Sequence, residues 1–185
     1  ARWMYLYLEI SPGQCRKTCD CLAKALQSPH LPAMTESPPL HIVCPHCHTT
    51  NRVRAAQLGS APDCGSCHRP LFTGHSTALA DAATFERHIS RNEIPVLVDF
   101  WAPWCGPCRQ MAPAYEQAAA QLEPHVRLAK VDTEAVPALG ARFNIRSIPT
   151  LALFRGGREG RGGHRALGEG ARRGLNLASE WRQRP

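Results

Sequence analysis

The stretch "VLVDFWAPWCGPCRQMAP", residues 96–113, joins an apolar strand to a helix through two cysteines. Its first six residues are apolar except for Asp99, which is typical of a strand buried inside a sheet. Apolar residues then recur with helical spacing at Met111, Tyr115, Ala118 and Leu122. The sequence therefore predicts a strand–helix unit whose junction carries Cys105 and Cys108.

Similar apolar patterns continue outward along the chain. Strand-like runs occupy residues 95–102, 126–133 and 150–155, and helix-like spacing appears in residues 108–122 and 134–143. Apolar runs that alternate with helical periods predict an α/β fold whose sheet contains at least one parallel crossover. With 185 residues, of which 43% are apolar, the chain can form one domain of ordinary size with an appendage.

The charge distribution argues against a nucleic-acid partner. The net charge of +7 divides into +2 for residues 1–33, +1 for residues 34–155 and +4 for residues 156–185. A nucleic-acid-binding domain would gather basic residues on its folded part, and here the central part is nearly neutral. No stretch approaches the roughly 18 apolar residues of a membrane span. Residues 1–13 lack the small-residue cleavage site of a secretory signal. We therefore expect no nucleic-acid or membrane partner.

Nine cysteines are many for this length, and six of them form three Cys-x-x-Cys pairs: Cys44/Cys47, Cys64/Cys67 and Cys105/Cys108. Secreted disulfide frameworks use scattered cysteines, whereas close pairs are typical of metal sites and redox centres. We therefore expect reduced thiols in a cytoplasmic protein. Because the spacing is the same in all three pairs, only their surroundings can separate metal binding from redox chemistry.

Residues 34–75 are expected to form a zinc ribbon. The pairs "CPHC" and "CGSC" flank 16 residues, and two such knuckles can direct four sulfurs at one tetrahedral Zn²⁺. The segment has few large apolar residues, so a bound metal would supply the folding free energy that its core cannot. We expect one structural Zn²⁺ per chain and no organic cofactor. The expected ligands are Cys44, Cys47, Cys64 and Cys67.

The alternatives to this metal site are free thiols or two disulfides, and His46, His48 or His68 could replace a cysteine ligand. "CPHC" is also similar to the active-site motif of periplasmic disulfide oxidases, which needs a helix from its first cysteine onward. Here residues 48–53, "HTTNRV", follow with two β-prone threonines and no helical period. The surroundings therefore favour metal binding.

The surroundings of the third pair favour redox chemistry. Cys105 follows an apolar strand and begins a helix, where unpaired backbone N–H groups and the helix dipole stabilise a thiolate. Cys105 is therefore the expected nucleophile. Cys108 lies one turn further into the helix, less exposed, and can attack a mixed disulfide at Cys105. Pro107 has no N–H to lose in the first helical turn and holds its shape.

These residues resemble the thioredoxin family in "VDFWA", "WCGPC", "KVDT" and "RSIPT", over about residues 77–158. With the cysteine-rich segment in front, the chain is similar to the zinc-containing bacterial thioredoxin 2 branch. The resemblance implies a thioredoxin fold, a central mixed sheet flanked by helices, over residues 76–158, with a small N-terminal zinc ribbon. It also implies a protein-disulfide reductase that acts on disulfide-containing client proteins. The implied protein is a monomer, re-reduced by an NADPH-dependent flavoprotein thioredoxin reductase.

The resemblance implies a role for Asp99 in proton transfer. A carboxylate in the middle of an apolar strand would be buried, with a raised pKa, and would exchange a proton with Cys108. In the alternative interpretation, Asp99 is a buried acid that pairs with Lys130, and both interpretations can hold together.

The resemblance also implies a surface for client proteins. Pro149 would be a cis proline that faces the disulfide, and the backbone of Ile148 would pair with an extended client segment. Trp104, Gly106 and Pro107, together with Ala102, would frame this surface, whereas Trp101 is expected to pack.

Two other functions fit parts of the sequence. A net disulfide oxidase or isomerase would use the same cysteines, but the Gly-Pro dipeptide at residues 106–107 and the missing signal peptide count against it. The second is a zinc-ribbon binding or regulatory module that uses the thioredoxin domain as a scaffold.

Both ends of the chain depart from the family pattern. Residues 1–33 carry Cys15, Cys19 and Cys21, which could form a second metal site. We expect instead a disordered extension upstream of a start at Met34. Residues 159–185 form a tail rich in glycine and arginine, whose composition suggests a shifted reading frame. We expect residues 159–174 to be irregular and mobile and the domain to be destabilised, although Leu175, Ala178 and Trp181 could form one short helix.

Overall fold

The computed structural model describes residues 38–156, 158–159 and 165–166. The chain divides into two units, Ala1–Glu36 and Ser37–Pro185, and all described residues belong to the second. The predictions for residues 1–33, including the second metal site, therefore concern residues outside the described part, as does the prediction of a short helix near the C-terminus. No described helix combines the length and apolar character that a membrane crossing requires.

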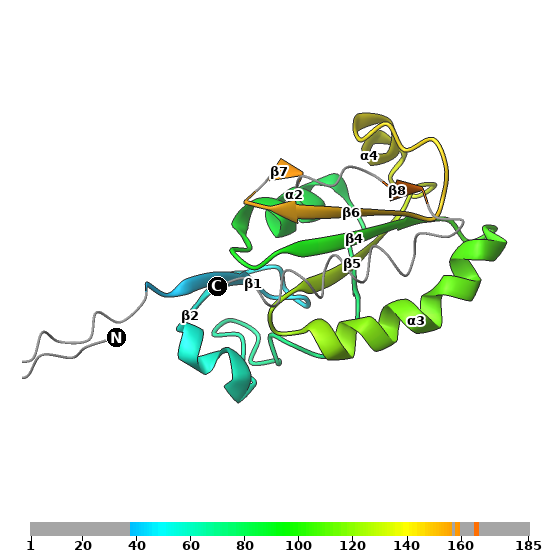
Figure 1. The fold of residues 1–185 in the computed structure, drawn as a ribbon. Coiled ribbons are helices and arrows are strands. Elements are labelled where there is room, and N and C mark those ends of the chain that lie inside the picture. The colour runs from blue at the N-terminus through cyan, green and yellow to red at the C-terminus, as the bar shows by residue number, and fades with distance from the viewer. Residues whose placement is uncertain (1–37, 157, 160–164, 167–185) are drawn as a thin grey trace, which may run out of the picture. The chain divides into compact units, whose positions relative to one another are not determined.

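A six-stranded mixed sheet forms the centre of the fold (Figure 1). Its strands are β3 (Thr77–Ala78), β4 (Val96–Trp101), β5 (Arg127–Asp132), β6 (Thr150–Arg155), β7 (Arg158–Glu159) and β8 (Arg165–Ala166). The order is β3-β5-β4-β6-β7, and β8 also pairs with β6. Strands β3, β4 and β5 are mutually parallel, whereas β6 is antiparallel to β4. The predicted parallel crossover is therefore confirmed and connects β4 to β5.

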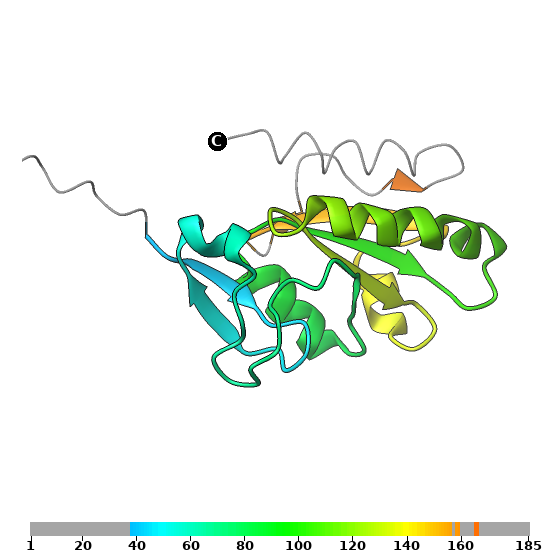
Figure 2. The ribbon, with the colours of Figure 1, turned by 90° about the horizontal axis from the view of Figure 1, so that it is seen from below.

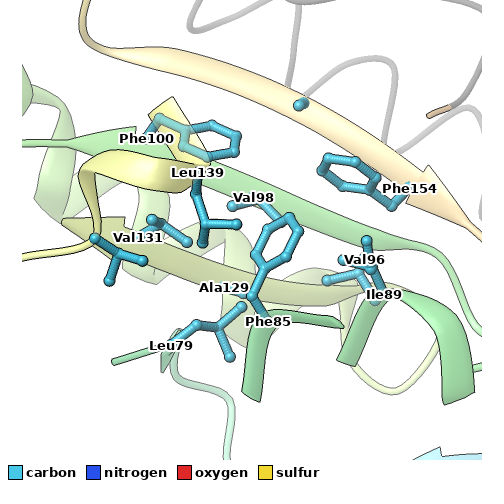
Figure 3. Close-up of a cluster of buried hydrophobic side chains, with 12 residues drawn as sticks. Leu79, Phe85, Ile89, Val96, Val98, Phe100, Ala129, Val131, Leu139 and Phe154 are labelled. Atoms are coloured by element: carbon cyan, nitrogen blue, oxygen red, sulfur yellow. The ribbon is translucent and has the colours of Figure 1, made fainter. Parts of the chain in front are cut away.

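Helices cover both faces of this sheet. Figures 1 and 2 show α3 (Gly106–Leu122) on one face and α2 (Ala82–Arg91) and α4 (Pro137–Arg142) on the other. Since successive side chains of a strand point to opposite faces, β4 contributes to both cores. Val98 packs with Phe85 of α2 and Leu139 of α4 (Figure 3). Leu97 packs with residues of α3 on the opposite face. Asp99 alternates with Val98 along β4 and therefore shares the α3 face.

The zinc-ribbon segment forms a small layer of its own. Strands β1 (Leu40–Val43) and β2 (Thr50–Val53) form an antiparallel hairpin, which a 3-10 helix (Ala55–Ser60) follows. Its core is small and includes one residue of the main domain, Ile94, beside Ile42, Val53, Leu58 and Leu71. The ribbon therefore completes its apolar core by packing on the sheet domain.

Hydrogen bonds from the backbone of β1 dock the ribbon onto the residues after α2. Val43 donates its backbone N–H to the side-chain carbonyl of the buried Asn92 at 2.7 Å. Glu93 donates its backbone N–H to the carbonyl of His41 at 3.0 Å. The sheet domain thus supplies hydrogen-bond partners to backbone groups on the outer edge of β1.

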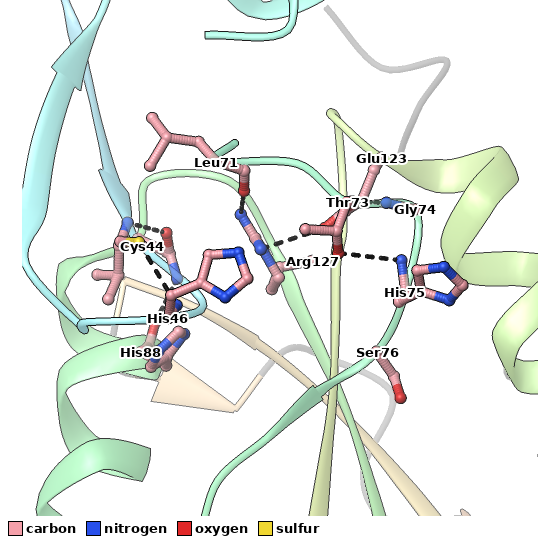
Figure 4. Close-up of polar contacts among 12 residues, drawn as sticks. Cys44, His46, Leu71, Thr73, Gly74, His75, Ser76, His88, Glu123 and Arg127 are labelled. Atoms are coloured by element: carbon pink, nitrogen blue, oxygen red, sulfur yellow. Dashed lines mark hydrogen bonds and ion pairs between the residues drawn. The ribbon is translucent and has the colours of Figure 1, made fainter. Parts of the chain in front are cut away.

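A buried arginine of β5, Arg127, forms an ion pair with Glu123 and a hydrogen bond with the end of the ribbon segment (Figure 4). Arg127 is fully buried, donates to the carbonyl of Leu71 at 2.6 Å and lies 3.2 Å from the carboxylate of Glu123. The same carboxylate accepts a hydrogen bond from the backbone N–H of Gly74 at 2.7 Å. Burial lowers the pKa of Arg127 and raises the pKa of Glu123, and each charge partly offsets this shift for the other.

The C-terminal strands correct part of the sequence prediction. A hairpin follows β6, and Gly156 supplies a φ of 57° in its turn. Glu159 then pairs with Phe154, while Arg165 and Ala166 pair with the start of β6. The expectation of irregular structure over residues 159–174 is therefore wrong at these three positions. Pairing joins main-chain groups, so a composition poor in strand formers does not prevent it.

Candidate functional site

The Cys105–Cys108 pair lies at the junction of β4 and α3, as predicted. The two residues form a disulfide with an S–S distance of 2.12 Å. Cys105 caps the helix, and its sulfur accepts a hydrogen bond from the backbone N–H of Cys108 at 3.2 Å. Pro107 occupies the first turn, where no N–H is required. A thiolate at Cys105 would receive this same N–H donor and the positive end of the helix dipole.

Exposure does not separate the two cysteines in the disulfide form. Cys105 is 3% exposed and Cys108 is 2% exposed, so the expected difference in accessibility is small. Their positions on the helix do separate them. Cys105 precedes the first turn, and its sulfur accepts the backbone N–H of Cys108, whereas Cys108 lies inside the turn. Any difference in their chemistry must therefore come from these hydrogen bonds and from their other neighbours.

Apolar residues from the end of β4 and from the segment before β6 surround the disulfide. The fully buried Ala102 packs against both cysteines, and the partly buried Trp101 and Ile148 pack against this cluster. The Ile148–Pro149 peptide bond is cis, which confirms the geometry expected at this position. The structure therefore brings Ile148, which is distant in sequence, next to Cys105 and Cys108.

Trp104 is the exposed part of this surface, with 66% of the residue accessible. Its indole N–H donates to the carboxylate of Glu134 at 2.6 Å, across 30 positions of sequence. Glu134 in turn donates its backbone N–H to the carboxylate of Asp132 at 2.9 Å, at the end of β5. Sequence reasoning missed Glu134, although an acid directly after "KVDT" offered a signal.

Asp99 is buried beneath α3 and is 1% exposed. Burial raises its pKa to about 7, and the positive charge of Lys130 opposes this shift only in part. Its Oδ1 atom has no hydrogen-bond partner among the described residues. Lys130 instead lies 4.0 Å from the carboxylate of Glu116, with its ammonium group over the ring of Trp101. The alternative in which Lys130 pairs directly with Asp99 is therefore not what the structure contains.

The second candidate centre is the four-cysteine cluster of the ribbon. Its sulfurs all lie within 4.8 Å of one another, and two of the distances, Cys44 to Cys67 and Cys47 to Cys64, are 3.6 Å. A tetrahedral Zn²⁺ with sulfurs at about 2.3 Å requires separations of about 3.8 Å between them. The observed cluster meets this requirement. Within the described chain, no histidine belongs to the group.

The two knuckles share one backbone pattern. Cys44 and Cys64 each accept, at their sulfurs, an N–H from the residue two positions later, at 3.4 Å in both knuckles. The residue after each second cysteine, His48 or His68, has a left-handed backbone with φ of 59° or 56°. This bend returns the chain and leaves the sulfurs on one side. His48 also lies 3.0 Å from the ring nitrogen of the buried His88 in α2, which ties the first knuckle to the sheet domain.

The electrostatics of the cluster favour a bound cation. Burial raises the pKa of Cys44 to about 12, whereas hydrogen bonds with Thr49 lower the pKa of Cys47 to about 6. Thiolates this close repel one another, so all four can ionise together only around a positive ion. Four sulfur donors in this geometry suit Zn²⁺ better than the harder Mg²⁺ or Ca²⁺ ions.

Two family models match the chain. The model described as thioredoxin matches residues 76–176, which is more than half of the chain. The model described as thioredoxin 2, N-terminal, a zinc ribbon, matches residues 43–69 and includes all four clustered cysteines. Along the chain, the match to the zinc ribbon comes first and contains the four-cysteine cluster. The match to thioredoxin follows and contains the Cys105–Cys108 pair.

Relatives and solved structures agree with these matches. Thioredoxin C-3 of Corynebacterium nephridii is 49% identical over 113 residues, which cover 61% of this chain and 77% of that protein. Thioredoxin 1 of a Nostoc species is 47% identical over 84 residues, which cover 45% of this chain and 78% of that protein. The structure of Plasmodium falciparum thioredoxin superimposes with a TM-score of 0.50 at 31% identity, covering 56% of this chain and 96% of that one.

These matches explain why the redox centre and the fold occur together. The matched region contains the disulfide at the start of a helix, the cis proline and the mixed sheet. Thioredoxins cycle between a dithiol and a disulfide, reduce disulfide-containing proteins and receive electrons from a thioredoxin reductase. The chain belongs to the thioredoxin family of thiol–disulfide oxidoreductases, as a protein-disulfide reductase preceded by the zinc-ribbon segment of thioredoxin 2.

Proposed function

We propose that Cys105 is the attacking nucleophile and Cys108 the resolving thiol. The Cys105 thiolate attacks one sulfur of a client disulfide, forms a mixed disulfide and releases the other client sulfur as a thiol. Cys108 then attacks the sulfur of Cys105, and the second client thiol leaves. Two electrons pass from the dithiol to the client, and the Cys105–Cys108 disulfide remains. The hydrogen bond from the Cys108 N–H to the Cys105 sulfur is the observation that carries this assignment.

Asp99 accepts the proton of Cys108 in the resolving step. A proton acceptor works best when its pKa lies near the working pH, and burial raises the pKa of Asp99 to about 7. An ordinary exposed aspartate would be ionised and weakly basic at this pH. The buried position on the α3 face of β4 supports this role, since Cys108 lies on α3.

Client proteins bind across the surface around the disulfide. Trp104 offers an exposed ring, and Gly106 and Pro107 leave the first helical turn free of bulky side chains. The backbone of Ile148, before the cis Pro149, pairs with an extended client segment. The packing of Ile148 against the cluster around both cysteines supports this placement.

The residues Cys44, Cys47, Cys64 and Cys67 hold one structural Zn²⁺ per chain. The metal supplies folding free energy to the ribbon, whose own apolar core is small. Its four thiolates fill the coordination shell, so no position is open for a substrate. The zinc site therefore stabilises the ribbon and takes no part in the disulfide exchange.

The reaction cycle takes place in the cytoplasm, and the protein acts as a monomer. Its disulfide is reduced again by a thioredoxin reductase of the NADPH-dependent flavoprotein type. The abundance of closely paired cysteines supports a reducing compartment, where such thiols persist.

A coupled assay tests this function. Reduction of insulin disulfides with NADPH and thioredoxin reductase is expected for the wild-type chain and is expected to be absent for Cys105→Ser. The ribbon variant Cys64→Ser/Cys67→Ser is expected to retain reduction at temperatures where it is folded. A folded ribbon variant without activity would instead favour a function that depends on the ribbon itself.

A further inference from the structure

Asn51 is a polar residue on the face of β2 that looks into the ribbon core. It stands opposite Ile42 in the hairpin register, and alternation along β2 places it on the same face as Val53, a residue of that core. Asparagine is depleted in strands, and an amide that leaves water needs hydrogen-bond partners in return. The partners of the Asn51 amide therefore indicate what this side chain does in the ribbon.

The side-chain amide of Asn51 makes three hydrogen bonds. Its oxygen accepts the backbone N–H of Gly65 at 2.9 Å, and its nitrogen donates to the carbonyl of Thr49 at 3.0 Å. The same nitrogen lies 3.5 Å from the sulfur of Cys64. Because a backbone N–H only donates and a carbonyl only accepts, the first two contacts fix which end of the amide is the nitrogen. The sulfur of Cys64 therefore receives an N–H donor.

These bonds join the two knuckles through one side chain. Thr49 follows the first knuckle, and its carbonyl also accepts the backbone N–H of Cys44. Gly65 directly follows Cys64, inside the turn of the second knuckle. The corresponding residue of the first knuckle is Pro45, which has no N–H to offer. A side chain can therefore hold the second knuckle in this way but not the first.

The sulfur of Cys64 has a donor that its counterpart Cys44 lacks. Each of these sulfurs accepts the N–H of the residue two positions later, Ser66 or His46. Asn51 adds a side-chain donor at Cys64, whereas among the described residues only cysteine side chains bond to the sulfur of Cys44. An N–H donor stabilises the negative charge of a thiolate. Groups that bond to metal ligands in this way orient the ligands and raise metal affinity.

Asn51 also lies between the Cys64 sulfur and an open hollow on the ribbon surface. The hollow has a volume of about 780 Å³, and its lining includes Asn51, Asp63, Gly65 and Ser66. Cys64 is enclosed by these lining residues in the sequence, but it is 1% exposed and does not belong to the lining. Since Asn51 contacts both the hollow and the sulfur, it covers one approach to this ligand.

We propose that Asn51 is a positioning residue for the zinc site, which retains the metal by donating to the Cys64 sulfur and by tying the second knuckle to β2. The bond to the sulfur stabilises the thiolate in one orientation, and the bonds to Gly65 and Thr49 keep the two knuckles together. The inference rests on the proposed binding of Zn²⁺ by the four cysteines. It adds a residue outside the coordination shell that controls how fast the metal leaves.

The first test measures the transfer of Zn²⁺ from the full-length chain to an excess of a chromogenic chelator. Asn51→Leu keeps a branched side chain of four heavy atoms but cannot form hydrogen bonds. Its transfer is expected to be faster by about 10-fold or more, because partners of metal ligands typically change metal affinity about 10–100-fold. Thr50→Val is the matched control, since Thr50 is the neighbouring residue of β2 and lines the same hollow. The control is expected to release zinc at the wild-type rate.

The second test separates the bond to the sulfur from a general effect on the ribbon. In the Co²⁺-substituted chain, the sulfur-to-metal charge-transfer absorption of Asn51→Leu is expected at longer wavelength. A thiolate that loses an N–H donor gives up electron density more easily, whereas a residue that only shapes the turn would not move this band. Asn51→Asp still accepts the N–H of Gly65 but cannot donate to Cys64. It is expected to show the same two changes, and it serves if the leucine variant does not fold.

Two outcomes overturn the inference. Wild-type transfer rates and wild-type charge-transfer bands in both Asn51 variants would show that the amide does not retain the metal. Faster transfer with an unmoved band would contradict the donation to the Cys64 sulfur and reduce Asn51 to a support of the turn. Failure of the proposed zinc site is distinguishable from both, because the wild-type chain would then bind neither Zn²⁺ nor Co²⁺, which refutes the inference together with the site.

Discussion

Asp99 and Lys130 stand opposite each other on the parallel strands β4 and β5, but the ammonium group of Lys130 makes its ion pair with Glu116. The carboxyl of Asp99 is thereby left buried, influenced by a positive charge that does not contact it. A buried acid without a direct partner opposes folding when it ionises. Its persistence in the core agrees with a role in chemistry, since strongly shifted pKa values often mark functional sites.

Replacing Asp99 by asparagine should therefore stabilise the oxidised protein at neutral pH. The pKa of Asp99 is raised to about 7 from 3.8, so between these values the folded state holds a proton that the unfolded state has lost. The free energy of unfolding then falls by on the order of 4 kcal/mol as the pH rises from 4 to 7. Above pH 7 it stays at this lower value. Asp99→Asn should remove this dependence and gain most at pH 8. Guanidinium unfolding at pH 4 and pH 8 measures it, and an equal effect at both values would contradict the raised pKa.

The purified chain should contain one zinc ion, held by the four clustered cysteines. Elemental analysis of protein prepared without chelator should give one zinc per chain, and Cys44→Ser should lose it. His46→Ala is the matched control, because His46 lies inside the first knuckle but outside the ligand cluster. Removal of the metal should lower the melting temperature, since the ribbon core is small. Absence of zinc from the wild-type chain would refute the ribbon assignment.

Removing only one partner of the buried Arg127–Glu123 ion pair should lower the free energy of unfolding strongly. Arg127→Met leaves the carboxylate of Glu123 buried without its cation, which typically costs about 3–5 kcal/mol of unfolding free energy. The double variant Arg127→Met/Glu123→Met should be less destabilised than Arg127→Met alone, because no unpaired charge remains. Arg91→Met removes an exposed arginine as a control and should cost less than about 0.5 kcal/mol. Chemical unfolding curves measure the free energy of unfolding of each variant. A double variant that is less stable than Arg127→Met would contradict this explanation.

The redox centre could be predicted from the sequence because its determinants are local. A strand, a cysteine and a helix follow one another within residues 96–113, and β4 and α3 formed where the apolar periods indicated. The four-cysteine cluster was predictable for a similar reason, since each knuckle is set by one short turn. The cis bond before Pro149 followed from the family resemblance of "RSIPT" and not from any local rule.

Contacts between distant segments could not be predicted. The hydrogen bond between Trp104 and Glu134 depends on how two loops meet. In the sequence, Tyr115 is one more apolar position of α3, and only the folded sheet shows that its hydroxyl donates to carbonyls of β4 and β5. Helix α2 was also missed, although Asp81 caps it by accepting the N–H of Thr84. Its apolar stripe is short, and its buried residues include His88, which a search for apolar periods passes over.

The most direct test of the account is the fate of client proteins mixed with two single-cysteine variants. Cys108→Ser retains the nucleophile but lacks the resolving thiol, so it should accumulate mixed disulfides linked through Cys105, stable without reductant and released by dithiothreitol. Cys105→Ser should trap few clients and show no turnover. Non-reducing gels followed by mass spectrometric mapping of the linked cysteine give the result. Equal trapping by both variants, or linkage through a ribbon cysteine, would contradict the assignment of Cys105 as the nucleophile.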